Sequence, residues 1–283
     1  MVAVKPNPKQ IAQLIESNLE IPTIPVVASK ALRAMQNENV TARDLANILQ
    51  EDPGLTARIL KVANSALYAL PREIKSLSQA AMVMGFDGLK NLVISAACRG
   101  IYKRYGDRER ALWIHAIACA TAAEEIAKAA GVAQDEAFVA GLMHDVGRVV
   151  MNNGARDKLA EADTIAENEG IESPEAEQRL FGFTHTDVGG LLVGRWNLSD
   201  SLEHAVFYHH DIELVDSLAP QSKSLVDIVH LANRVCHAVG AGCPVEEDVE
   251  LEYEESAQSL GIDAGALAEI VTAVRDRVDN AED

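Results

Sequence analysis

A histidine followed directly by an aspartate, His144-Asp145, stands in the otherwise apolar stretch from Gly141 to Val150. A buried imidazole or carboxylate costs free energy unless it is paired, and a charged aspartate is almost never left inside a protein without a partner. The pair therefore needs partners from elsewhere in the chain. Further histidines embedded in apolar helical patterns are His115, His185, His209 and His210.

Neutral imidazoles with one carboxylate suit a first-row transition metal such as Fe, Mn, Zn or Ni, and helices can hold such ligands rigidly. We interpret these six residues as a metal-ligand set spread over several helices. Two divalent ions would bring four positive charges against the single negative charge of Asp145, so one ion is favoured over two. A buried network of His and Asp hydrogen bonds without a metal remains the alternative.

The elements that must position these residues are predicted to be helices. Aromatic residues make up only 4% of the chain, so the interior must come from Leu, Ile, Val, Ala and Met, which favours closely packed helices. No segment of the first hundred residues alternates apolar and polar residues at every second position. The predicted fold class is therefore all-α.

Several residue patterns predict where helices begin and end. Thr41 and Thr184 are expected to cap the helices that follow them, and Asp52 before Pro53 predicts another helix start. Gly85 is expected to end a short helix that begins at Ser76.

Four longer helices are predicted to carry the chemistry. One covers about 109–130 and holds Trp113 and His115. A central helix, capped by Asp135, is expected to hold His144 and Asp145. The other two are expected at 199–210 and 221–239.

The charged connector from Tyr102 to Arg110 is the predicted boundary between two helical lobes. The first lobe covers 1–105, and the second, 106–240, holds the metal site. Residues 241–283 form a C-terminal helical extension. Because both lobes offer many apolar helix faces, we expect a substantial interface between them rather than a flexible tether.

The formal net charge of −18 and the absence of a dense basic cluster argue against nucleic acid as a partner. The same charge would be repelled by an anionic membrane surface, and we expect no apolar run close to the ~20 residues that span a bilayer. The first ten residues lack a secretory signal, so a cytoplasmic location is expected. Four cysteines without C-x-x-C spacing are expected to be reduced thiols.

Short motifs along the chain resemble, in order and spacing, those of the HDOD family, bacterial signalling modules related to the HD superfamily of metal-dependent phosphohydrolases. The resemblance spans roughly Leu19 to His210. In the first half it rests on Ile21-Pro22-Thr23-Ile24-Pro25, Asp52-Pro53-Gly54-Leu55-Thr56, Val62-Ala63-Asn64-Ser65 and the helix end at Ala80 to Gly85. In the second half it rests on Gly141 to Gly147, His185 with Gly189, and His209-His210.

The resemblance implies that the same six residues, His115, His144, Asp145, His185, His209 and His210, are metal ligands. The chain departs from its metal-dependent relatives in three places. Asn233 stands where they carry a late aspartate, Arg148 stands where phosphodiesterases carry a lysine, and Asp211-Ile212-Glu213 replaces their Gly-Tyr-Pro segment.

Two functions follow from this resemblance. The favoured one is a regulatory module that acts by binding signalling protein partners or a ligand, with self-association into a homo-oligomer left open. The alternative is a metal-dependent phosphohydrolase acting on a nucleotide or cyclic dinucleotide. In that case His144, Asp145 and Arg148 would be the catalytic residues. The three departures favour the non-enzymatic function.

Overall fold

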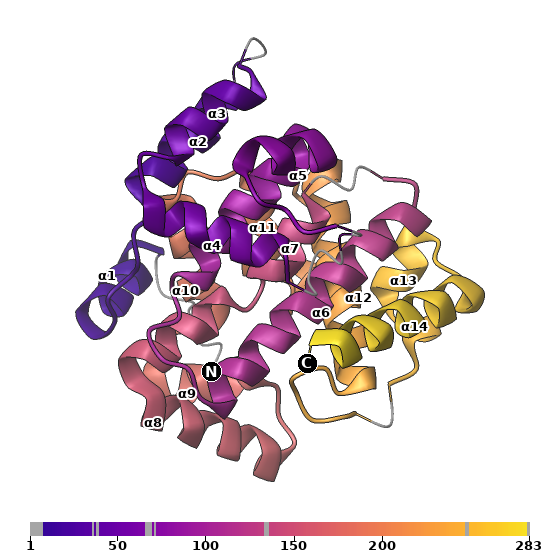
Figure 1. The fold of residues 1–283 in the computed structure, drawn as a ribbon. Helices are drawn as coiled ribbons and strands as arrows, with labels where there is room; N and C mark the ends of the chain where they lie inside the picture. Colours follow the sequence, from indigo (N-terminus) through magenta and orange to yellow (C-terminus); the bar gives the residue numbers. More distant parts are fainter. Residues whose placement is uncertain are drawn as a thin grey trace.

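The computed structural model describes residues 8–35, 37, 40–65, 70, 72–132, 136–246 and 249–281 (Figure 1). Every regular element among these residues is a helix, which confirms the predicted all-α fold. The first five are α1 (Pro8–Asn18), α2 (Val26–Ala34), α3 (Ala42–Leu49), α4 (Pro53–Ala63) and α5 (Leu77–Arg99).

The predicted helix starts in this first part are confirmed. Thr41 forms a capping box with Asp44, so each side chain satisfies a backbone N–H at the start of α3. The carboxylate of Asp52 accepts the N–H of Leu55 at the start of α4. Ser76 caps α5 in the same way.

Helix α5 is two helical runs joined at Gly85, where φ is +73° and the axis kinks sharply. The predicted helix end at this glycine is thus confirmed. The expectation that no apolar run approaches membrane-spanning length is wrong for α5. This helix of 23 residues contains an 18-residue window with a mean hydropathy of 1.2, so it could cross a membrane by length and composition alone, and half of that window is buried within the protein.

Seven helices of the second part surround the candidate site. They are α6 (Asp107–Ala129), α7 (Ala137–Met143), α8 (Val146–Glu169), α9 (Ser173–Phe181), α10 (His185–Arg195), α11 (Asp200–Tyr208) and α12 (Pro220–Val239). The helices expected at 109–130, 199–210 and 221–239 correspond to α6, α11 and α12. Thr184 caps α10 with a capping box, as predicted.

The predicted central helix through His144 and Asp145 is wrong. Helix α7 ends at Met143 and α8 begins at Val146, with Asp145 between them at φ −99° and ψ 14°. These non-helical dihedrals turn the carboxylate out of the helical path toward the other histidines, which a continuous helix would not do. The predicted cap, Asp135, lies outside the described residues.

Helix α6 lies beside α12 and α14 in the second part (Figure 1). Many of its buried side chains are alanines. Small side chains let neighbouring helices approach closely. Gly141 of α7, for example, lies so near that an added Cβ would be 2.5 Å from the carbonyl oxygen of Cys119. The buried alanines of α6 are Ala116, Ala118, Ala120, Ala122, Ala123 and Ala127.

A short 3-10 turn, η1 (Ile212–Leu214), lies between α11 and α12. The elements that follow α12 are η2 (Leu251–Tyr253), α13 (Glu255–Leu260) and α14 (Ala264–Ala281). Helix α13 packs on α12, and α14 packs along α6. Figure 1 shows both C-terminal helices on the same side of the molecule as α12. The lobe boundaries proposed at 105 and 240 stay predictions.

The N-terminal part of the chain contacts the second part directly. The indole N–H of Trp196, which directly follows α10, donates to the carbonyl oxygen of Pro22 at 3.0 Å. The side chain of Asn153 in α8 donates to the carbonyl oxygen of Ile101, just after α5, at 2.8 Å. These bonds join the end of α10 to the segment before α2, and α8 to the end of α5.

Candidate metal centre

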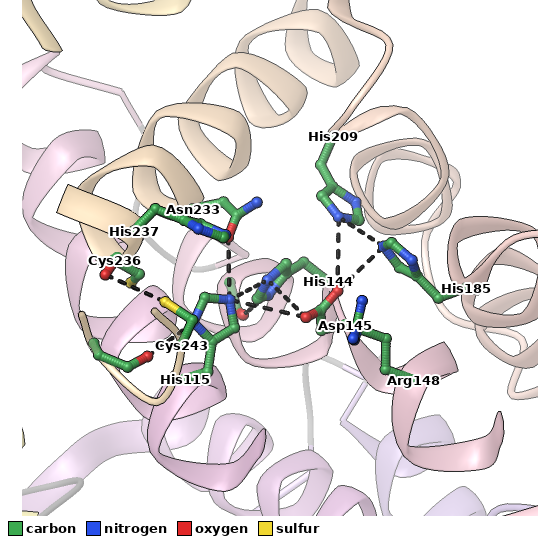
Figure 2. A network of polar contacts seen from close by, with 12 residues as sticks. His115, His144, Asp145, Arg148, His185, His209, Asn233, Cys236, His237 and Cys243 are labelled. Atoms are coloured by element: carbon green, nitrogen blue, oxygen red, sulfur yellow. Dashed lines mark hydrogen bonds and ion pairs between the residues drawn. The ribbon is translucent and has the colours of Figure 1, made fainter. Parts of the chain in front are cut away.

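The six predicted ligands converge between α6, α8, α10 and α12, although their positions span almost a hundred residues of sequence. Figure 2 shows five of them, His115, His144, Asp145, His185 and His209. His115 comes from α6, His144 and Asp145 from the α7–α8 junction, and His185 from the first turn of α10. The paired histidines follow the end of α11. The ligand atoms form two groups, each within 4.8 Å: His115, His144 and Asp145, and His185, His209 and His210.

The carboxylate of Asp145 lies between the two groups. Its Oδ2 atom is 3.8 Å from Nε2 of His115 and 3.8 Å from Nε2 of His144. Its Oδ1 atom is 3.2 Å from Nε2 of His185 and 3.9 Å from Nε2 of His209. Each oxygen thus faces a different pair of imidazoles, as Figure 2 shows. One side chain therefore contacts both groups.

Four of the histidines are buried, and each uses its Nδ1 atom for a hydrogen bond on the outer side of the centre. The bonds run from His115 to Ala241 O (3.0 Å), from His144 to Gly141 O (2.8 Å), from His209 to Val206 O (2.9 Å) and from His185 to Glu177 Oε2 (2.7 Å). Carbonyl and carboxylate oxygens only accept, so the ring proton of each neutral imidazole is on Nδ1. The Nε2 lone pairs then all point inward.

The four inward Nε2 atoms form two close pairs. Nε2 of His115 is 3.2 Å from Nε2 of His144, and Nε2 of His185 is 3.4 Å from Nε2 of His209. Without a proton between them such pairs repel. Two nitrogens each about 2.05 Å from one tetrahedral ion would be about 3.3 Å apart. The donor set and its spacing therefore fit a metal ion.

Burial favours the neutral form of His115, His209 and His210. It lowers the pKa of His115 to about 4, with neighbouring His144 adding to the effect. Burial also lowers the pKa values of His209 and His210 well below their usual range. For Asp145 burial alone would raise the pKa, but the surrounding imidazoles and Arg148 together hold it well below its usual value. A metal ion requires imidazole ligands that are neutral and carboxylate ligands that are ionised.

Asn233 of α12 lies beside His115, as predicted, with its Oδ1 atom 3.1 Å from Nε2. Both of these atoms are acceptors when the ring proton of His115 is on Nδ1, and the two ends of an amide have the same shape, so we assign the amide nitrogen to this position. With that assignment the amide donates to Nε2 of His115 and competes with the centre for its lone pair. The lone pairs of the His185 group have no such competitor among the described residues.

Glu177 of α9 is a site residue that the sequence did not reveal. Its Oε2 atom accepts both the ring N–H and the backbone N–H of His185, each at 2.7 Å. Arg148 donates to the other oxygen of Glu177 at 3.3 Å and to Asp163 at 2.5 Å. The structure places the guanidinium of Arg148 in a carboxylate network that orients His185.

Glycines allow the elements of the site to approach closely. Gly147, in the first turn of α8, lies against the first turn of α10. An added Cβ there would be 1.9 Å from the carbonyl oxygen of His185 and 2.9 Å from the N atom of Gly189. Only glycine fits at this backbone contact, which sets the separation of Asp145 and His185.

A pocket of about 550 Å³ opens onto the centre and exposes part of Asp145 and His210. The charged residues that line it are five carboxylates and three guanidinium groups: Asp145, Asp163, Glu167, Glu172, Glu246, Arg108, Arg148 and Arg234. Each arginine is already paired. Arg108 pairs with Asp163, and Arg234 pairs with Glu246 and Glu254.

Known proteins resemble this chain in sequence and in fold. The chain is 26% identical over 245 residues to an uncharacterized protein of Treponema pallidum, a match that covers 84% of this chain and 46% of that protein. The chain thus spans about half the length of that curated relative.

Solved structures share the fold over nearly the whole chain. An HDOD domain protein of unknown function from Geobacter sulfurreducens is 28% identical with a TM-score of 0.79, covering 97% of each chain. A Shewanella amazonensis protein provisionally named a phosphohydrolase is 24% identical (TM-score 0.73, covering 96% of this chain and 97% of that one). A Marinobacter aquaeolei protein provisionally named for signal transduction is 21% identical (TM-score 0.75, covering 98% and 65%). The last two show the fold alone.

The sequence profile of the HDOD domain matches residues 21–212, which include both halves of the motif pattern and six of the helices that surround the centre, α6 to α11. The chain therefore belongs to the HDOD domain family.

Proposed function

We propose that this chain is a regulatory HDOD module whose His/Asp centre holds one divalent transition-metal ion, and that it acts by binding signalling partners rather than by hydrolysis. The observation that carries the metal is the close approach of Nε2 of His185 and Nε2 of His209, 3.4 Å apart, with the outer Nδ1 of each ring already bonded. A cation between these two buried lone pairs would remove their repulsion.

We assign the ion to His185, His209 and His210, with Oδ1 of Asp145 completing the set. This group is favoured because Asn233 competes for the lone pair of His115 in the other group. One ion also balances the single ligand charge better than two. Glu177, bonded to the outer nitrogen of His185, orients that ligand and raises its basicity.

The pairing of the pocket arginines supports a role other than phosphoester hydrolysis. A phosphate is bound best by guanidinium donors that are free to form bidentate hydrogen bonds. Here each guanidinium that lines the pocket already pairs with a carboxylate. The excess of carboxylates in the wall would also repel an anionic substrate.

Phosphohydrolase activity is the second candidate, because the pocket leads directly to Asp145 and to the exposed edge of His210. A bound ion there would supply a water of lowered pKa. Asp145 would hold a proton-accepting position beside it, and Arg148 could reach a substrate only by releasing Asp163 or Glu177.

Two measurements on the same preparation test the proposal. Elemental analysis of protein purified without added metal should give about one transition-metal ion per chain. A panel of nucleotides, cyclic dinucleotides and generic phosphoesters with Mn, Fe and Mg should show no turnover. The matched variants are Asp145→Ala, expected to lose the ion, and His204→Ala in α11, expected to keep it.

Turnover that disappears in Asp145→Ala would overturn the regulatory assignment in favour of the enzyme. Unchanged metal content in Asp145→Ala would place the ion elsewhere and reject the centre itself. Removal of the ion with a chelator should lower the melting temperature of the wild-type protein, because an ion bound only to the folded state stabilises it.

A further inference from the structure

A second cavity, of about 370 Å³, lies where the N-terminal helices meet the second part of the chain. One side is formed by α2 and by the run of α5 that follows the bend at Gly85. The other side is formed by α7 and by the turn from α10 to α11. We call it the junction cavity. No described residue lines both this cavity and the pocket at the candidate centre, so the two are separate sites.

The inner surface of the junction cavity is apolar. Ile94 of α5, Val139 of α7 and Leu202 of α11 line it and are at most 3% exposed. Leu32 and Met35, at the end of α2, extend this apolar wall and are half-buried. Sites for small molecules occupy ~300–1,000 Å³ and combine an apolar lining with a few polar groups. The volume of the junction cavity, at the small end of that range, suits a molecule about the size of an amino acid.

Three charged side chains line the same cavity. They are Asp87 and Lys90 of α5 and Glu136, which directly precedes α7. Lys90 and Glu136 are half-buried, and Asp87 is exposed. In the part of the chain that the structure describes, none of the three comes within ion-pairing distance of an opposite charge. The arginines of the first pocket, in contrast, are all paired.

Unpaired charges of both signs beside an apolar surface are complementary to a zwitterion with an apolar side chain. Such a ligand can bridge Lys90 and Glu136, which do not reach one another directly. A ligand that carries only a carboxylate would face Glu136 and Asp87 without a cation to offset them, and one that carries only an ammonium would leave Lys90 unpaired. Charge-assisted hydrogen bonds at both ends are also stronger than neutral ones.

We propose that the junction cavity binds a free apolar α-amino acid. Its carboxylate pairs with Lys90, its ammonium pairs with Glu136, and its side chain packs against Ile94, Val139 and Leu202. This site goes beyond the proposed function and does not rest on the metal centre. The ligand contacts the N-terminal helices and the second part at once, so its binding stabilises their docking.

Leucine and phenylalanine are the probes that test the class of ligand. Each is compared with the amine that lacks the carboxylate, 3-methylbutylamine or phenethylamine, and with the acid that lacks the ammonium, 4-methylpentanoate or 3-phenylpropionate. Serine lacks only the apolar side chain. Calorimetric titration of the full chain should show at least one of the two amino acids binding, with its own analogues and serine about tenfold weaker or more. An analogue that binds as tightly as its parent amino acid would overturn the assigned class, and no binding of either probe would reject the site.

Methyl signals in nuclear magnetic resonance spectra locate the ligand. Those of Ile94, Val139 and Leu202 should shift as the bound amino acid is added. The methyl signals of Leu267, buried in α14, should stay in place and serve as the internal control. Cavity methyl signals that do not move at saturation would place the ligand elsewhere and reject the site.

Two charge-removing variants test the bridge between the walls. Lys90→Met keeps much of the apolar side chain but loses the ammonium. It should weaken binding of the amino acid about tenfold and leave binding of the amine analogue unchanged, because that analogue has no carboxylate. Glu136→Gln should show the opposite selectivity, weakening the amino acid and leaving the acid analogue unchanged.

Exposed residues provide the matched controls, Lys61→Met in α4 and Glu252→Gln, and neither should change any affinity. Selectivity separates a direct contact from a general loss of stability, since a destabilised cavity would bind every probe less tightly. If Lys90→Met weakened the amino acid and its amine analogue equally, Lys90 would not be the partner of the carboxylate and the proposal would be overturned.

Discussion

Asn233 is the single residue on which the number of ions depends. Its amide satisfies Nε2 of His115 and adds no charge. An aspartate of the same shape would accept instead of donate and would supply the second negative ligand that the His115 group lacks.

We therefore predict that Asn233→Asp raises the metal content from about one to about two ions per chain. Elemental analysis after dialysis against Zn or Mn measures this. Asn197→Asp is the control, because it adds the same charge at an exposed position where φ is already +53°. A content that stays at one ion in Asn233→Asp would show that the amide is not what keeps the second group empty.

The metal-free protein should lose stability as the pH falls from about 6.5 to about 4. The pKa of His115 is lowered to about 4 in the folded state, whereas the unfolded chain has an ordinary value of about 6.5. Between these values the unfolded state binds a proton that the folded state does not, so acid favours unfolding. The stabilisation is complete above pH 6.5 and is lost on the way down to pH 4.

For His115 alone the loss is roughly 3 kcal/mol across that window, and His209 and His210 add to it in the same direction. Urea titrations of chelated protein at several pH values measure the free energy of unfolding. A free energy that is constant from pH 7 to 4.5 would contradict the burial of neutral imidazoles.

The side chains of the centre could be predicted from the sequence, but the groups that accept hydrogen bonds from their Nδ1 atoms could not. His115, His185 and His209 could be found because a histidine inside an apolar helical pattern is unusual. Glu177 lies in a helix whose other residues are largely polar, so nothing local distinguishes it. Ala241 acts through its carbonyl oxygen, a group that every residue carries, and only the folded chain shows which one meets His115.

At the scale of elements, the contact between α8 and α10 sets the separation of two ligands. Gly147→Ala would place a Cβ 1.9 Å from the carbonyl oxygen of His185, where neither backbone can give way without moving a ligand. We predict a loss of about 3 kcal/mol or more in the free energy of unfolding, together with loss of the metal.

Gly265→Ala provides the comparison, since its nearest neighbour is the side chain of Asp263 at 3.3 Å and it lies in the first turn of α14. It should be neutral or slightly stabilising, because alanine favours helix more than glycine does. Chemical unfolding and elemental analysis of both variants measure these effects. A tolerated alanine at 147 would mean that α8 and α10 are not in backbone contact.

Helix starts were easier to predict than helix breaks. The side chains of Thr41, Asp52 and Thr184 each accept a backbone N–H three residues further along the chain. Such a helix start can therefore be predicted from a few neighbouring residues. The break at Asp145 falls on neither glycine nor proline, whereas the bend at Ala155, where φ is −144°, directly follows Gly154. No capping or breaking residue marks the position of Asp145, which is why a continuous central helix was expected and not found.

At the scale of the whole molecule, hydrogen bonds between the N-terminal helices and the second part should make unfolding cooperative. Trp196 bonds to Pro22 O and Asn153 to Ile101 O, and both bonds join segments far apart in sequence. We predict a single calorimetric transition for the metal-free protein, with equal calorimetric and van't Hoff enthalpies. Two resolved transitions would show that the lobes fold independently.

The many buried alanines of α6 have a further consequence for the order of the centre. Side chains that freeze on folding lose rotamer entropy, but alanine has none to lose. The six buried alanines therefore pack α6 against neighbours on two sides without that cost. Alanine also has no alternative rotamer through which such a contact could rearrange. His115 is thus carried on a support that is rigid before any ligand arrives, and little of the binding free energy need be spent on ordering it.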